Sequence, residues 1–247
     1  MGYRGETAGD AVEAPTAGGV LRLVIEPRMI RLSHGQRSLH IADELATLVE
    51  HGKSKDDSYP YPLAGPLVIA RDVPRDDLGI WVEVPPRGKR PAGMRRIFGV
   101  EPLSLLERDG LAALQVLDSL VHRLRAATSQ ITGTVRRAIE MGSAKSNGLD
   151  KILLVDHGDR YAVFSRALFR DRARLAFTVH DDGRVEAVTP KGTIGVTVKS
   201  KFGVTVLGDY IRFADSQGND VVRVSLPWIE PEDRRELARR IGQLVDR

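Results

Sequence analysis

The longest regular pattern of apolar residues in the chain lies between residues 105 and 141. Apolar side chains recur there every three or four residues, with Thr128 as the one polar interruption, at Leu114, Leu117, Val121, Leu124, Ile131, Val135 and Ile139. This spacing, held over about seven turns, is typical of an amphipathic helix with one buried stripe. We therefore predict one long central helix that separates two β-rich segments.

The segment before this helix contains short apolar runs bounded by turn residues, which is typical of strands. We expect strands at residues 20–25, 29–32, 38–41, 67–70 and 79–84. Asp43 is placed to cap a short helix at residues 44–50, and residues 53–66 are predicted to form a loop. Residues 1–19 are small, polar and rich in Gly, Ala and Pro, so we predict a disordered tail there.

The segment after the helix has closely spaced strands separated by Gly, Asp and Asn turns. The expected strands are residues 151–155, 160–165, 175–180, 184–188, 192–199, 203–207, 210–214 and 221–226. Strands at such short spacing predict an antiparallel meander. A closing helix is expected to begin at Pro231, with Glu232 and Asp233 near its positive end, and to bury Leu237, Ile241 and Leu244.

These patterns together predict an α+β protein, mainly antiparallel β-sheet, with one long central amphipathic helix and a C-terminal helix. The expected parts are a tail (residues 1–19), an N-terminal β-rich part (20–100), the long helix and linker (101–148), and an antiparallel meander closed by a helix (149–247). The long helix needs apolar cover, which favours one compact unit over two separate domains.

The C-terminal segment resembles the end of a pleckstrin-homology-like domain. Its last two strands, residues 210–214 and 221–226, meet at a turn containing Gly218 and Asn219, and Trp228 lies at the junction with the closing helix. Residues 22–41 are similar in style to the first strands of bacterial pleckstrin-like domains. The resemblance implies a pleckstrin-like meander, and it assigns a function to no residue.

Composition excludes several classes of function. The chain has no cysteine, which excludes disulfides, thiolate catalysis and cysteine-ligated metals. No apolar run approaches the roughly 18 residues of a membrane-spanning helix, so we expect a protein that does not cross a membrane. The absence of cysteine is compatible with a cytoplasmic location, which we also expect. The net charge of +4 is spread along the chain, and this argues against nucleic acid as the main partner.

Candidate catalytic chemistry is limited to two His-Asp turns. The chain has no P-loop, G-x-G-x-x-G, G-x-S-x-G or H-E-x-x-H motif, and no cofactor is expected. The two groups that could ligate a metal or provide acid–base catalysis are His157 with Asp156 and Asp159, and His180 with Asp181 and Asp182. We expect both groups to be hairpin turns, because Asp and Gly are typical turn residues. A metal-dependent hydrolase that uses them is the alternative hypothesis.

The candidate binding residues form the densest basic cluster in the chain. Five cations lie within ten residues, with no acidic residue among them: Arg87, Lys89, Arg90, Arg95 and Arg96. Prolines and glycines around them predict a restrained loop that could bind phosphates or an anionic surface. We therefore predict a non-catalytic binding or adaptor protein, bound to an acidic protein partner or peripheral to an anionic membrane. Weak nucleic-acid binding through this loop is a second alternative.

Overall fold

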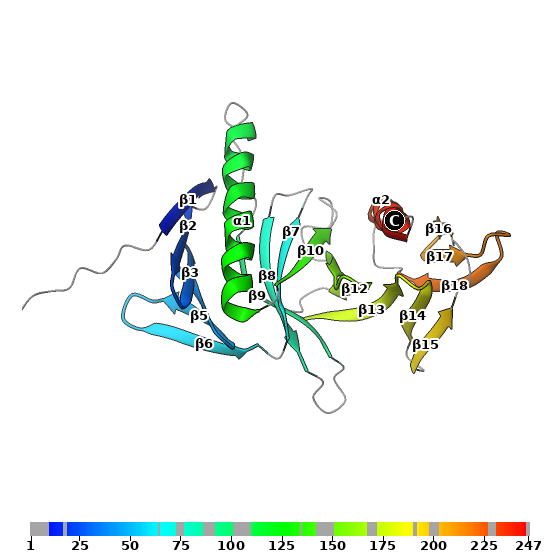
Figure 1. Cartoon of the computed structure of the whole chain (residues 1–247), viewed down its shortest axis with the longest axis horizontal. Coiled ribbons are helices and arrows are strands. Elements are labelled where there is room, and N and C mark those ends of the chain that lie inside the picture. The colour runs from blue at the N-terminus through cyan, green and yellow to red at the C-terminus, as the bar shows by residue number, and fades with distance from the viewer. Residues whose placement is uncertain are drawn as a thin grey trace, which may run out of the picture. The chain divides into compact units, whose positions relative to one another are not determined.

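The computed structural model describes residues 10–16, 19–63, 65–72, 77–85, 92–100, 110–133, 135–141, 151–166, 172–189, 192–197, 203–226 and 231–245. This part of the chain contains eighteen strands and two helices, so the protein is mostly β (Figure 1). The residues group into two compact units. The first comprises Met1–Ile69, Asp76–Glu83 and Ile97–Val135, and the second comprises Ala70–Arg75, Val84–Arg96 and Arg136–Arg247.

The first unit contains a six-stranded antiparallel meander. Its strands pair in chain order: β1 (Asp10–Thr16), β2 (Gly19–Glu26), β3 (Met29–His34), β4 (Arg37–Ala42), β5 (Leu45–His51) and β6 (Asp56–Pro62). Alternate residues of β2, β3 and β4 are buried, as the period of a strand with one buried face requires: Leu21, Leu23, Ile30, Leu32, Leu39 and Ile41.

Helix α1 (Gly110–Thr132) covers the buried face of this meander, next to β1, β2 and β3 (Figure 1). Its side chains Leu117, Leu120, Val121 and Leu124 are buried in the same core as the meander's apolar face. Thr128 is buried too, and its hydroxyl donates to the carbonyl of Leu124 at 2.6 Å. The polar interruption of the stripe is thus satisfied within the helix.

The prediction of an α+β fold with one long central helix over residues 105–141 is wrong. The described helix ends at Thr132, and Val135–Met141 forms strand β10. Gly133 explains the end of the helix, because its φ of 82° is the left-handed conformation that commonly terminates helices. Val135 and Ile139 continue the helical spacing by coincidence, since residues four apart also lie on one face of a strand. Residues 101–109 lie outside the described part of the chain.

The short helix predicted at residues 44–50 is also wrong, because this segment is β5. Strand β5 pairs with β4 on one side and β6 on the other, and these two ladders outweigh the weak local preference for a helix. Asp43 does not cap a helix. It lies in the two-residue turn between β4 and β5 and has a φ of 42°, which makes it the one described non-glycine residue with positive φ.

We expect glycine to be tolerated at position 43 and alanine to be destabilising. The left-handed conformation of Asp43 costs an ordinary L-residue about 1 kcal/mol, whereas glycine adopts it freely. Asp43→Ala should lower the free energy of unfolding by about 1 kcal/mol, and Asp43→Gly should leave it equal to or above wild type. Urea unfolding of the three proteins checks this. Equal losses in both variants would instead point to a role for the carboxylate.

Two further segments form strands where other conformations were predicted. Residues 10–16 form β1 in the segment predicted as a disordered tail, and β6 lies inside the predicted loop at 53–66. Both are the outer strands of the six-stranded sheet. The position of β6 at the edge explains how it accommodates Pro60 and Pro62, since an edge strand can lack ladder donors.

The second unit contains most of a nine-stranded sheet. Its strand order is β12-β11-β10-β7-β8-β9-β13-β14-β15, and β12 also pairs with β13, which nearly closes the sheet on itself. The strands are β7 (Leu67–Asp72), β8 (Asp77–Val84), β9 (Gly93–Val100), β10, β11 (Lys151–Asp156), β12 (Arg160–Arg166), β13 (Arg172–His180), β14 (Arg184–Thr189) and β15 (Gly192–Thr197).

A three-stranded antiparallel sheet and helix α2 (Pro231–Val245) complete the second unit. The sheet is formed by β16 (Gly203–Leu207), β17 (Tyr210–Ala214) and β18 (Asp220–Ser225). Its inner face, Leu237 and Ile241 of α2, and apolar residues of β11–β14 share one core. Phe177 of β13 and Phe213 of β17 pack edge to face there, with ring centroids 5.7 Å apart and planes at 73°.

Candidate functional site

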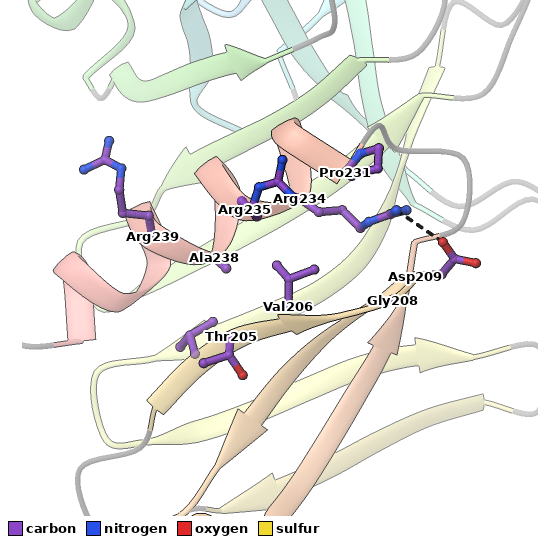
Figure 2. Close-up of a pocket in the computed structure, with 10 residues that line it drawn as sticks. Thr205, Val206, Gly208, Asp209, Pro231, Arg234, Arg235, Ala238 and Arg239 are labelled. Carbon is purple, nitrogen blue, oxygen red and sulfur yellow. Dashed lines mark ion pairs between the residues drawn. The ribbon is translucent and has the colours of Figure 1, made fainter.

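A groove lies in the second unit between β16 and one face of α2. Its volume is about 580 Å³. Residues of the β16–β17 hairpin form one wall and residues of α2 form the other: Val204, Thr205, Val206, Gly208 and Asp209, then Pro231, Arg234, Arg235, Ala238 and Arg239. The α2 residues recur at the three-to-four spacing that places them on one helical face. Figure 2 shows α2 running alongside β16, with Val206 and Ala238 facing each other.

Arg234 is buried at the end of the groove and connects its two walls. The residue is 4% exposed, and Nη1 donates to the carbonyl of Leu226 at 2.8 Å. Nη2 lies 3.2 Å from Oδ1 of Asp209, the contact drawn in Figure 2. Asp209 also accepts, through its backbone carbonyl, a hydrogen bond from the amide of Leu226. Arg234 therefore holds α2 against the β16–β17 turn and the end of β18.

The other two arginines of the groove differ in their partners. Arg239 makes two hydrogen bonds to Glu236, at 2.8 and 2.7 Å, and Arg240 makes a third to the same carboxylate at 2.7 Å. The hydrogen bond from Arg239, aided by Arg240, lowers the pKa of Glu236 to about 2. Arg235 is exposed and has no hydrogen bond or ion pair within the described residues. Arg235 is therefore the cation of this groove that is open to an anionic ligand.

The basic cluster predicted as the binding site is described only in part. Arg87, Lys89 and Arg90 lie outside the described residues. Arg95 and Arg96 are half-buried members of β9, and Arg95 is opposite Arg172 of β13. The described end of the cluster is thus a paired strand, and binding by the five residues stays a prediction.

The two His-Asp turns lie at the same end of the neighbouring strands β12 and β13. Arg160 is opposite His180 in the β12–β13 ladder, and the amide of Asp181 donates to the carbonyl of Asp159 at 3.1 Å. His180, however, is directed at Glu186, with Nε2 and Oε2 3.6 Å apart. Burial, together with Arg160 and Arg136, lowers the pKa of His157. Within the described residues, no group of three His, Asp or Glu side chains is arranged to hold a metal.

A hydrogen-bonded Ser-His-Asp arrangement lies on the outer face of the first unit's meander. Nε2 of His51 is 3.1 Å from Oγ of Ser38, and Nδ1 of His51 is 3.0 Å from Oδ2 of Asp56. Nε2 of His40 also contacts Oγ of Ser38, at 3.3 Å. The sequence analysis missed this network, because it follows from the pairing of β5 with β4 and β6, and β5 was predicted as a helix.

This network has the residue types of a catalytic triad but lacks the other requirements of acyl transfer. Ser38 is 2% exposed, and both histidines contact its hydroxyl. It also lies within β4, between β3 and β5, so the nearby amides belong to sheet ladders and cannot form an oxyanion hole. One proton arrangement satisfies the whole network: His51 donates to Asp56, Ser38 donates to His51, and His40 donates to Ser38. We interpret the network as structural.

We expect the network to make folding stability sensitive to pH. Burial, followed by the nearby Arg31 and His51, lowers the pKa of His40 below its usual 6.5. The unfolded chain then binds a proton more readily than the folded one, so the free energy of unfolding should fall as the pH falls below 6.5. The lowered pKa of His157 acts in the same direction.

The variant His40→Gln isolates the contribution of the first unit. Glutamine retains a donor for Ser38 and does not titrate, so the fall in stability between neutral pH and about pH 5 should be smaller than in wild type. Urea unfolding across this range measures the difference. Identical pH profiles for the two proteins would show that His40 does not contribute.

Comparison with known proteins does not identify a family. No family model and no curated protein match the chain. One similar solved structure comes from a structural and mechanistic analysis of two prolyl endopeptidases. It is 11% identical, and the match covers 92% of this chain and 37% of that chain at a TM-score of 0.25. The chain therefore spans little more than a third of that protein, and a likeness this distant supports no argument about function.

Proposed function

We propose that the protein is a non-catalytic binding protein whose groove between β16 and α2 binds an acidic protein partner. The observation that carries the proposal is Arg235, an exposed cation that lines the groove and has no partner within the described residues. Arg234 and Arg239 add positive charge, and Asp209 is the single acidic side chain among the lining residues. A groove with this balance favours a ligand that brings negative charge.

The wall of the groove is suited to binding because it is held in place before a partner arrives. Arg234 fixes the β16–β17 turn to α2, and Leu237 and Ile241 fix α2 to the core of the second unit. A preformed site avoids the entropy of ordering a loop upon binding. The alternative hydrolase hypothesis has less support, because His180 contacts Glu186 and Arg184 instead of turning toward His157.

The proposal is tested with a hexaglutamate peptide and a hexalysine peptide of the same length. In NMR titrations at low salt, the glutamate peptide should shift the amide resonances of the β16–β17 hairpin and of α2, and added salt should weaken the effect. Arg235→Gln should weaken binding by about tenfold, as expected for loss of one charge-assisted contact. Arg22→Gln is the control, because it removes the same charge from an exposed residue of the first unit.

An anionic membrane is the competing partner, and vesicles distinguish it. Neither described helix is long and apolar enough to cross a membrane. Co-sedimentation with anionic and neutral vesicles would compare wild type with a variant in which Arg87, Lys89, Arg90, Arg95 and Arg96 are changed to Gln. Anionic-vesicle binding that is lost in this variant, with no peptide effect at the groove, would contradict the proposal and favour a membrane-peripheral protein.

A further inference from the structure

We propose that the partner enters this groove as an extended segment, pairs with the edge of β16 that has no neighbouring strand among the described residues, and places a carboxylate on Arg235. The inference rests on the proposed function and specifies the conformation and chemistry of the ligand. It is carried by three features of the second unit: the edge of β16, the shape of the α2 wall, and the position of the unpartnered arginine.

Strand β16 is the outermost strand of its three-stranded sheet in the described part of the chain. Leu207 and Tyr210 close a two-residue turn, in which Gly208 has a φ of 56°, so they form a hydrogen-bonded pair. Alternation along the ladder then makes Val206 and Val204 members of pairs without mutual hydrogen bonds. Their N–H and C=O groups point away from β17, toward the open edge.

Outward-pointing backbone groups at alternate residues are what an added strand requires. A helical ligand satisfies its own backbone groups and would leave those of Val204 and Val206 without partners. An extended peptide can donate to and accept from both residues, and this type of recognition recurs wherever a sheet presents a free edge. The edge therefore favours an extended ligand.

The α2 wall leaves space above this edge. Ala238 is the lining residue opposite Val206 (Figure 2). Gly242 follows it by four residues in α2, and the helical period places it on the same face. A Cβ built on Gly242 would meet nothing within 4 Å. Because the side chains at these two positions are small, they project little from α2 into the groove. A side chain of an added strand can therefore pack between α2 and β16.

Arg235 lies on the same face of α2, three residues before Ala238. An added strand directs alternate side chains toward one wall, so one of them is directed at α2. Arg234 already contacts Leu226 and Asp209. Arg239 extends away from β16 in Figure 2 and is hydrogen-bonded to Glu236. A glutamate or aspartate facing α2 therefore pairs with Arg235.

Three peptides test the inference on the intact chain. The first alternates threonine and valine over eight residues with one central glutamate, the second has glutamine at that position, and the third repeats the first with N-methyl groups on alternate amides. Fluorescence anisotropy should show the first peptide binding about tenfold more tightly than either of the others, since one lacks the charge and the other cannot form the ladder. Bound peptide should slow hydrogen exchange at the amides of Val204 and Val206.

Protein variants separate the backbone contribution from the side-chain contribution. Val206→Pro removes the outward amide of β16, whereas Val206→Ala shortens the side chain and keeps the amide. Binding should be lost in the proline variant and largely kept in the alanine variant, with both shown to be folded by the dispersion of their NMR spectra.

The outcomes separate this inference from the proposed function. If the N-methylated peptide binds as well as its parent, or Val206→Pro binds normally, the ligand is not an added strand and the inference is wrong. The proposed function would still stand in that case, provided that hexaglutamate binding depends on Arg235. If no peptide binds and hexaglutamate leaves the groove resonances unchanged, both are wrong.

Discussion

Replacing Phe213 with alanine should lower the free energy of unfolding of the second unit by about 4 kcal/mol. Phe213 is fully buried and packs edge to face on Phe177, and the pair joins the three-stranded sheet to the larger sheet. Truncation removes apolar contact area and leaves a cavity, because the two sheets are each fixed by their own ladders and cannot close the gap.

Tyr210→Ala is the matched control for this variant. Tyr210 is an aromatic residue of the same strand, but it is 42% exposed, so its loss should change the free energy of unfolding by roughly 0.5 kcal/mol or less. Chemical unfolding followed by the near-ultraviolet signal measures both. Similar losses in the two variants would show that the aromatic pair does not connect the sheets.

Arg234→Met should destabilise the second unit by about 2 kcal/mol. Methionine keeps most of the apolar stem, but the carbonyl of Leu226 loses a donor at 2.8 Å and stays buried, and a buried group without its partner costs about 1–3 kcal/mol. The lost contact to Asp209 adds little, because that carboxylate is exposed. Loss of Arg234 should also loosen the groove wall.

Arg235→Met provides the comparison for Arg234→Met. The side chain of Arg235 is exposed and has no partner in the described residues. Its replacement should therefore leave the free energy of unfolding within about 0.5 kcal/mol of wild type. Thermal unfolding measures both variants. A gain in stability for Arg234→Met would contradict the conclusion that Arg234 stabilises the contact between α2 and the β16–β17 turn. It would mean that the desolvation penalty of the buried guanidinium, whose Nε has no partner, exceeds the free energy gained from its contacts.

The sequence predicted antiparallel strands well where the pattern was local. Turns such as Gly183 and Gly208 adopt positive φ where short β-runs meet, and turn chemistry is readable from neighbouring residues. The prediction of secondary structure failed where the spacing of apolar residues fits both a helix and a strand. Val135 and Ile139 fit a helix and a strand equally, and Gly133 marks the end of α1. The helix prediction at residues 44–50 failed because this segment pairs with β4 on one side and β6 on the other, and these ladders determine its conformation.

The candidate site was less predictable than the fold, since the groove and the burial of its arginines depend on tertiary packing. The sequence shows Arg234, Arg235 and Arg239 as ordinary charges on the polar face of a helix. Burial of the first and the openness of the second follow only when α2 is placed against β16. The pairing of the third with Glu236, three residues earlier in the same helix, follows from helical spacing alone. The density of positive charge along the sequence instead predicted a binding site at residues 87–96.

The prolines of β6 bear on how the protein behaves at high concentration. Pro60 and Pro62 lie in an edge strand whose residues are nearly all exposed, and each removes an N–H that an incoming chain would need. That edge of the first unit is therefore a poor template for intermolecular sheet growth. Strand β16 has no proline or charged residue. Concentrated samples should accordingly self-associate through the second unit, and the acidic peptide should suppress this association by covering the edge.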